Sequence, residues 1–150
     1  MTEDDFDAIT GLNLKAAFFL AQIVARRMVE GRRGGAILHI SSQMGHVGGQ
    51  NRTVYCMTKH GIEGLTKAMA IDLAPHGIRV NSIGPTFIDT PLTRPFFQDP
   101  TFRDDVLRKI KLGRLGRVED LMGAVVFLAS DAAALVTGTS LVVDGGWTAD

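Results

Sequence analysis

Residues 36–59 read AILHISSQMGHVGGQNRTVYCMTK and decide how the rest of the chain is arranged. The first six, Ala36 to Ser41, form a nearly continuous apolar run, which is typical of a strand buried on both faces of a sheet. A loop with three glycines follows, and from about Thr53 to about Leu73 apolar side chains recur at helical spacing. A buried strand, a loop and a long helix together predict one unit of a parallel sheet.

The alternation of helix and strand continues on both sides of this stretch. Upstream, Thr2 and Asp5 are spaced as a capping box, and apolar side chains then recur at three- and four-residue steps to about Val29, which predicts a long helix. Downstream, residues 86–112 are interrupted by prolines and show no clear period. The remaining predicted elements are a strand at Arg79 to Ile83, a helix at Val118 to Ala129 and a strand within GTSLVVDGG (138–146).

This order of elements favours an α/β fold, in which helices cover both faces of a parallel sheet of about three strands. We expect residues 1–150 to form a single domain. Ligands of such sheets bind beyond the carboxyl ends of the strands. The segments expected there are 42–54, 84–112 and the tail after Val143.

The composition argues against several kinds of partner. Acidic and basic residues balance at 16 each, which gives no electrostatic reason to expect binding to nucleic acid or to an anionic membrane. No uninterrupted apolar run has the length that a bilayer span needs, and the acidic start MTEDDFDAITG is unlike a signal peptide. Cys56 is the only cysteine, which favours a reduced, cytoplasmic setting. No spacing of His, Cys, Asp and Glu predicts a metal site.

Tyr55 is the only tyrosine, and Lys59 follows it by one helical turn, so the two side chains share a helix face. An ordinary tyrosine holds its proton to about pH 10 and is a poor acid or base at neutral pH. A cation within about 4–6 Å favours the phenolate, so Lys59 is a plausible activator of Tyr55. The alternative is a chance pairing on an amphipathic helix.

Other polar residues have both a functional and a structural interpretation. Ser42 ends the first strand, where its hydroxyl would bind a substrate oxygen or simply cap a turn. Asn13 lies within a predicted helix, where asparagine is unfavourable unless its side chain has a task or a backbone partner. Met44 and His46 follow Ser42, and pocket lining and loop packing are equally open for both. His39 lies inside a strand and is expected to be a packed core residue.

Three stretches resemble the short-chain dehydrogenase/reductase family. Residues 37–85 (ILHISSQM to RVNSIGP) resemble its central catalytic segment, residues 12–22 (LNLKAAFFLAQ) resemble the helix with its fourth catalytic residue, and residues 113–147 (GRLGRVED to VVDGGW) resemble its C-terminal signature. The resemblance implies the C-terminal part of a Rossmann-like doubly wound sheet. It also implies an NAD(P)-dependent oxidoreductase that transfers a hydride between the nicotinamide and a secondary alcohol or ketone.

The resemblance also assigns roles to four residues. Tyr55 would be the general acid/base, and Ser42 would orient the substrate oxygen. Lys59 would favour the phenolate and hydrogen-bond the nicotinamide ribose. Asn13 would hold a water behind the lysine in a proton relay.

Cofactor contacts are implied for Tyr55 and Lys59 and, further along the chain, for Pro85, Ile88 and Thr90. The family pattern has Pro-Gly here, and this chain has Thr86 in place of the glycine. The Cβ of Thr86 leaves the backbone less freedom than a glycine would. The sequence GPTFIDTPLT (84–93) is similar to that of family members that act on sugar acids or polyols. A 3-oxoacyl substrate is the other possibility.

The family's glycine-rich fingerprint, Thr-Gly-x-x-x-Gly-x-Gly, does not occur in these 150 residues. The sequence therefore predicts NAD or NADP as the cofactor without deciding between them, and a partial domain that begins at a methionine usually internal to the family. The alternative to an oxidoreductase is a truncated, inactive fragment that acts only through oligomerisation.

The resemblance further implies a homodimer or homotetramer. Family members pair through the helix that follows Asn13 and the helix that carries Tyr55, and also through the C-terminal strand region. In this sequence the apolar residues expected at the helical interface are Phe18, Phe19, Ile23, Ile62, Leu65 and Met69.

Overall fold

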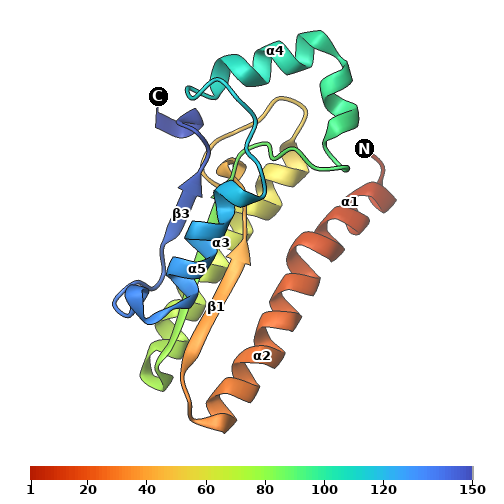
Figure 1. Ribbon diagram of the computed structural model, residues 1–150. Helices are drawn as coiled ribbons and strands as arrows, with labels where there is room; N and C mark the ends of the chain where they lie inside the picture. Colours follow the sequence, from red (N-terminus) through yellow and green to blue (C-terminus); the bar gives the residue numbers. More distant parts are fainter. Residues whose placement is uncertain (150) are drawn as a thin grey trace.

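A parallel sheet forms the centre of the computed structural model, which describes residues 1–149 (Figure 1). Its strands, in spatial order, are β1 (Gly35–Ile40), β2 (Ile78–Pro85) and β3 (Ser140–Val143). Ile40 pairs with Ile83, and Pro85 pairs with Val143, so the carboxyl ends of the strands meet at one edge of the sheet.

Helices lie on both faces of this sheet (Figure 1). They are α1 (Glu3–Thr10), a π-helical segment (Gly11–Ala16), α2 (Ala17–Gly31), α3 (Thr53–Leu73), α4 (Pro100–Lys109) and α5 (Glu119–Ala129). On one face, Ala25 of α2 and Ala70 of α3 pack on Ile37 and Val80 of the sheet. On the other, Leu128 of α5 packs with Ile83. The predicted α/β fold with a parallel sheet is therefore confirmed.

The predicted element boundaries are correct to within about two residues, except between the second strand and α5. There the sequence was expected to lack regular structure, yet it contains a 3-10 helix (Arg94–Gln98) and α4. Prolines start these helices rather than breaking them, since Pro100 is the first residue of α4 and its missing N–H has no helical partner to lose. The Asp99 carboxylate caps α4 by accepting the backbone N–H of Thr101 at 2.9 Å.

The first helix begins as predicted. The Asp5 carboxylate accepts the backbone N–H of Thr2 at 2.9 Å, and the Thr2 hydroxyl accepts that of Asp5 at 3.2 Å, which is a complete capping box. The helix then runs without a break to Gly31, but residues 11–16 are wound as a π-helix. This widened turn contains Asn13, and such turns are frequent at functional sites.

The same helix is long and apolar on average, although the sequence has no uninterrupted apolar run of the length that a bilayer span needs. Its 29 residues include a stretch of mean hydropathy 1.5, which suffices by length and composition alone. Alanine, phenylalanine, leucine and isoleucine side chains raise the average despite Asn13 and Lys15. One side of the helix is covered by the protein, where Ala21 and Ala25 are buried.

Strand β1 lies at one edge of the sheet, with β2 on its inner side. Ile40, at its end, is 59% exposed. Within residues 1–149 no strand pairs with the outer side of β1.

Candidate active site

Tyr55 and Lys59 lie in the first two turns of α3, next to the carboxyl end of β1. The Lys59 Nζ atom is 5.7 Å from the centroid of the Tyr55 ring and donates a hydrogen bond to the Ile40 carbonyl at 3.0 Å. That bond fixes the ammonium at the end of the strand and leaves its other N–H groups for further partners. The predicted sharing of one helix face is therefore confirmed.

Burial lowers the pKa of Lys59, and the negative charge of Glu63 opposes that shift. Glu63 follows Lys59 by one helical turn and is itself 6% exposed. Because Glu63 is buried, solvent screens its attraction for the Lys59 ammonium only weakly, and this attraction favours the charged form of Lys59.

Ser42 follows β1 directly and is 6% exposed. Its Oγ atom accepts the backbone N–H of Met44 at 3.1 Å and donates to Oε1 of Gln43 at 2.8 Å. The hydroxyl thus caps the 3-10 turn Gln43–Gly45, which was the structural alternative for this residue. It also lines the cavity that contains Tyr55, and the binding of a substrate oxygen stays a prediction.

A cavity of about 400 Å³ brings the predicted residues together at the carboxyl edge of the sheet. Its walls come from the end of β1, the start of α3 and the segment after β2. Among its lining residues are Ser42, Tyr55, Lys59, Pro85, Ile88 and Thr90. Met44 lines it as well and also lies against Gly49 of the loop, so pocket lining and loop packing both hold for this residue.

Asn13 is the predicted site residue that does not line this cavity. Its Nδ2 atom donates to the Thr58 hydroxyl at 3.1 Å, and that hydroxyl donates to the Tyr55 carbonyl at 2.8 Å. Asn13 therefore lies behind the helical turn that carries Tyr55 and Lys59. Asn13 belongs to the π-helical turn, and this turn lies against α3.

A buried polar cluster behind the site was not predicted. Glu63 accepts hydrogen bonds from the hydroxyls of Ser82 at 2.8 Å and Ser140 at 3.3 Å, and Nε2 of His46 lies 3.5 Å from its carboxylate. His46 Nε2 is also 3.0 Å from the Ser140 hydroxyl, so this histidine packs the loop and does not line the cavity. The sequence signal that was overlooked is an acid four residues after Lys59, on the same helix face.

His39 is a core residue, as predicted, with 8% of its surface exposed. Its Nδ1 atom is 2.9 Å from the Thr66 hydroxyl. Burial lowers the pKa of His39, and the charge of Glu63 opposes the shift only in part.

The walls of the cavity fit the nicotinamide end of a dinucleotide. Lys59 presents ammonium N–H groups there, and the Thr86 hydroxyl is buried without a hydrogen-bond partner in the described chain. Thr86 does not have a positive φ, since Arg32 and Asn51 are the non-glycine residues that do among residues 1–149. A threonine in place of the family's glycine therefore causes no backbone strain there.

Known proteins resemble this chain over nearly all of its length. The family model described as enoyl-(acyl carrier protein) reductase matches residues 1–148. L-xylulose reductase from Bos taurus is 39% identical over 149 residues, 99% of this chain and 61% of that protein. L-rhamnose 1-dehydrogenase (NAD(P)(+)) from Azotobacter vinelandii is 47% identical over 136 residues, 91% of this chain and 53% of that protein.

Solved structures agree with the sequence relatives. A gluconate 5-dehydrogenase from Burkholderia cenocepacia, in complex with NADP and tartrate, superposes with a TM-score of 0.96 at 37% identity, over 100% of this chain and 58% of that one. The chain thus spans 53–61% of the length of these three proteins.

Proposed function

Because the chain belongs to the short-chain dehydrogenase/reductase family and forms the C-terminal part of its Rossmann fold, we propose that it is the catalytic part of an NAD(P)-dependent oxidoreductase. The reaction is the interconversion of a secondary alcohol and a ketone on a small polyol, a sugar acid or a 3-oxoacyl compound. The observation that carries this proposal is the arrangement of Ser42, Tyr55 and Lys59 around one cavity at the carboxyl edge of the sheet.

Each side chain has a defined task in the direction of ketone reduction. The Tyr55 hydroxyl gives its proton to the substrate oxygen. The Ser42 hydroxyl turns from Gln43 and donates a hydrogen bond to the same oxygen, which stabilises the negative charge that develops there. The Lys59 ammonium stabilises the negative charge left on the Tyr55 oxygen. When bound, the nicotinamide cofactor supplies or accepts the hydride.

Asn13 supports the return of the proton. Its amide nitrogen is held by Thr58, so its side-chain oxygen can accept a hydrogen bond from a water behind Lys59. The proton that Tyr55 gives up would be replaced along this path. Lys59, Pro85, Ile88 and Thr90 would hold the nicotinamide and its ribose.

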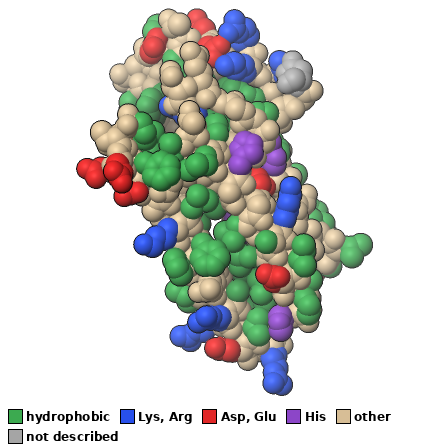
Figure 2. Space-filling view, turned by 180° about the vertical axis from the view of Figure 1, so that it is seen from behind, with side chains coloured by type: hydrophobic (Ala, Val, Ile, Leu, Met, Phe, Trp, Pro, Cys, Tyr) green, Lys and Arg blue, Asp and Glu red, His purple; other side chains and the backbone are tan. Residues whose placement is uncertain are grey.

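We expect the protein to be a cytoplasmic homodimer or homotetramer. Large apolar side chains are exposed on the first helix, where Phe18, Phe19 and Ile23 are 43%, 49% and 57% exposed. Figure 2 shows hydrophobic side chains at the surface along the length of the molecule, on the side opposite to the view in Figure 1. Ile62 was expected on this interface, but it is only 2% exposed and belongs to the core.

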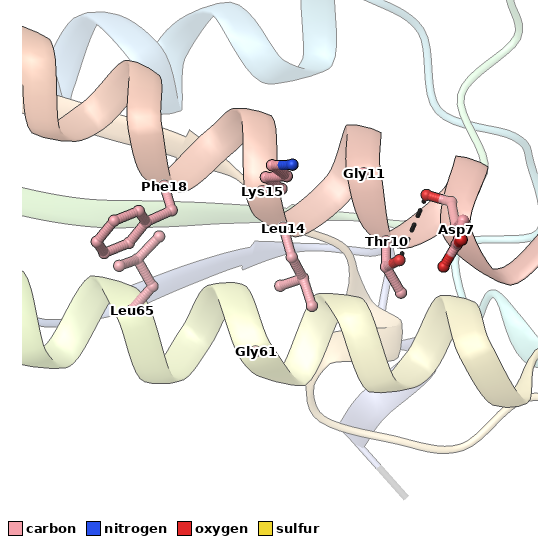
Figure 3. A pocket seen from close by; sticks show the side chains of 8 residues that line it. All are labelled: Asp7, Thr10, Gly11, Leu14, Lys15, Phe18, Gly61 and Leu65. Atoms are coloured by element: carbon pink, nitrogen blue, oxygen red, sulfur yellow. Dashed lines mark hydrogen bonds between the residues drawn. The ribbon is translucent and has the colours of Figure 1, made fainter.

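A groove between the first helix and α3 is the centre of this candidate interface (Figure 3). Its volume is about 700 Å³. Leu14 lies over Gly61, where an added Cβ would be 2.7 Å from Leu14 Cδ2, and Phe18 lies beside Leu65 (Figure 3). The close approach of the two helices leaves their outer edges free to pack on a second copy.

The test of the proposed function is Tyr55→Phe in the complete protein that contains this chain, assayed with NADH and NADPH on sugar-derived ketones. The change removes only the hydroxyl, so turnover should fall by at least about 100-fold while the melting temperature stays near that of the parent. Equal turnover in the variant and the parent would refute the assignment of Tyr55.

A further inference from the structure

Arg52 is a cation of the catalytic cavity for which the reaction provides no task. It lies three residues before Tyr55, is half-buried and lines both the catalytic cavity and an adjoining cavity of about 680 Å³. The adjoining cavity extends toward α4 and Trp147. Arg52 therefore stands where the two cavities meet.

The guanidinium of Arg52 is almost without protein partners. The hydrogen bond recorded for it in the described part of the chain goes from NH1 to the Asn51 carbonyl and is long, at 3.4 Å. Among residues 1–149, Arg52 forms no salt bridge with a carboxylate. A guanidinium has five N–H donors, so most of them are free to bind a ligand.

The acids near this junction are already engaged. No aspartate or glutamate lines the catalytic cavity, whose walls are all within the described chain. In the adjoining cavity, Asp99 caps α4 through the backbone of Thr101, and Asp105 pairs with Arg108 and with Lys109 at 2.8 Å. Among residues 1–149, no carboxylate forms an ion pair with Arg52.

The backbone holds Arg52 in place. Its N–H donates to the Gly49 carbonyl at 3.2 Å, which closes a tight turn, and Asn51 within that turn has a left-handed φ of 56°. Gly49 has no room for a side chain, because an added Cβ would be 3.2 Å from the Cβ of Arg52 and 3.0 Å from Met44. The turn therefore fixes the backbone of Arg52 at the start of α3, next to the loop, and its side chain lines both cavities.

Part of the wall is polar and suits a hydroxylated ligand, between apolar side chains such as Phe87 and Leu92. Gln43, Thr90 and Thr93 line the catalytic cavity together with Ser42, and its volume of about 400 Å³ is that of a small-molecule site. A planar guanidinium binds a carboxylate through two parallel hydrogen bonds. The polar side chains of the wall suit the hydroxyl groups of a ligand, and a guanidinium without a carboxylate partner suits its acid group. A small hydroxy acid has both kinds of group.

We propose that Arg52 binds the carboxylate of the substrate, so that the preferred substrate is a polyhydroxylated acid and not a neutral polyol or an acyl thioester. This inference rests on the proposed function. Tyr55 and Ser42 act on the reacting hydroxyl or carbonyl, and Arg52 holds the acid group at the other end of the molecule. No covalent step involves Arg52.

The experiment compares matched substrates in the complete protein with its cofactor. D-gluconate and D-glucitol differ only in a carboxylate against a hydroxymethyl group, and kcat/KM is measured for both. Arg52→Gln should lower the ratio of the two values by about 10- to 100-fold, as expected when a charge-assisted hydrogen bond is lost. Arg52→Lys should restore part of the ratio, and Arg103→Gln, an exposed arginine of α4, should leave it unchanged.

A binding assay separates this inference from the proposed function. Tartrate and its neutral analogue threitol are titrated while the fluorescence of Trp147 is followed, since this residue lines the adjoining cavity. Tartrate should bind the parent and Arg103→Gln, and it should bind Arg52→Gln at least about 10-fold more weakly. If the parent turns over no substrate and tartrate still depends on Arg52, the proposed function fails and the anion site stands.

Three results would overturn the inference while leaving the oxidoreductase intact. One is an unchanged gluconate-to-glucitol ratio in Arg52→Gln. The second is tartrate binding that does not depend on Arg52. The third is a loss confined to acetoacetyl-CoA or to NADP affinity, which would assign Arg52 to the phosphates of a carrier or of the cofactor.

Discussion

The carboxylate of Glu63 and the hydroxyl of Ser82 are joined by a hydrogen bond of 2.8 Å that ties α3 to the middle strand of the sheet. Glu63 is 6% exposed and lies one helical turn after Lys59. The lysine at the centre of the candidate active site is therefore backed by a buried negative charge that is fixed to the sheet.

Glu63→Gln should change the pH dependence of the reaction. The glutamine keeps an acceptor for Ser82 but removes the charge that opposes the lowering of the Lys59 pKa by burial. The pKa of Lys59 should fall further, so the alkaline limb of ketone reduction should move to lower pH. Glu119→Gln, an exposed acid at the start of α5, is the control. Superimposable pH–rate profiles for Glu63→Gln and the parent would show that the carboxylate does not influence Lys59.

Asn13 and Thr58 can be separated by a pair of variants. Asn13→Ala removes both the hydrogen bond to Thr58 and the oxygen proposed to hold a water, whereas Thr58→Val keeps that oxygen and removes the hydrogen bonds of the Thr58 hydroxyl to Asn13 and to the Tyr55 carbonyl. Each should cost about 1 kcal/mol of stability, but only Asn13→Ala should lower kcat with KM unchanged. If both variants lower kcat equally, Asn13 acts through its contact with Thr58 and not through a proton relay.

The burial of His39 should make the protein less stable in acid. Because burial lowers its pKa below the ordinary value of 6.5, the unfolded chain takes up a proton below that pH while the folded chain does not. Stability is therefore unaffected at pH 7.5 and falls as the pH drops below 6.5, by at most about 1.4 kcal/mol per pH unit. Thermal melts should show that the loss between pH 7.5 and pH 5.5 is smaller in His39→Gln than in the parent. An equal loss in His39→Gln, or the same reduction in the exposed control His76→Gln, would remove His39 as the cause.

The exposed apolar side of the first helix should form a contact between copies. Light scattering at micromolar concentration should give the mass of a dimer or tetramer for the complete protein. Phe19→Glu should shift it toward the monomer, because a carboxylate is costly to bury at an apolar interface. Val118→Glu, at an exposed position before α5, should have no such effect. A parent that is a stable monomer would rule out the interface.

The 150-residue chain by itself should be marginally folded or associated, with no tight nicotinamide binding and no measurable dehydrogenase activity. Among residues 1–149 no strand pairs with the outer edge of β1, and Ile40 at its end is exposed, so the strand is a template for association. The fluorescence of Trp147 during titration with NADH and NADPH reports cofactor binding. Saturable micromolar binding by a monomer that melts cooperatively would contradict this prediction.

The sequence alone determined the features that depend on local spacing. The face shared by Tyr55 and Lys59 follows from their separation of four residues, and the capping box of Thr2 and Asp5 follows from their separation of three. The three strands were predictable because buried parallel strands are short apolar runs. A helix of 21 residues was predicted at Thr53–Leu73 because its apolar side chains repeat with the helical period.

Only the tertiary structure decided which side chains are buried and what they contact. Glu63 is polar in sequence, yet residues from two other strands and a loop enclose it, and Ile62 beside it turned out to be core and not interface. That Arg52 has no carboxylate partner among residues 1–149 is visible only once the partners of the nearby acids are known. The reason is physical: hydrogen bonds, ion pairs and burial join residues that are distant in the chain, and periodicity describes only neighbours.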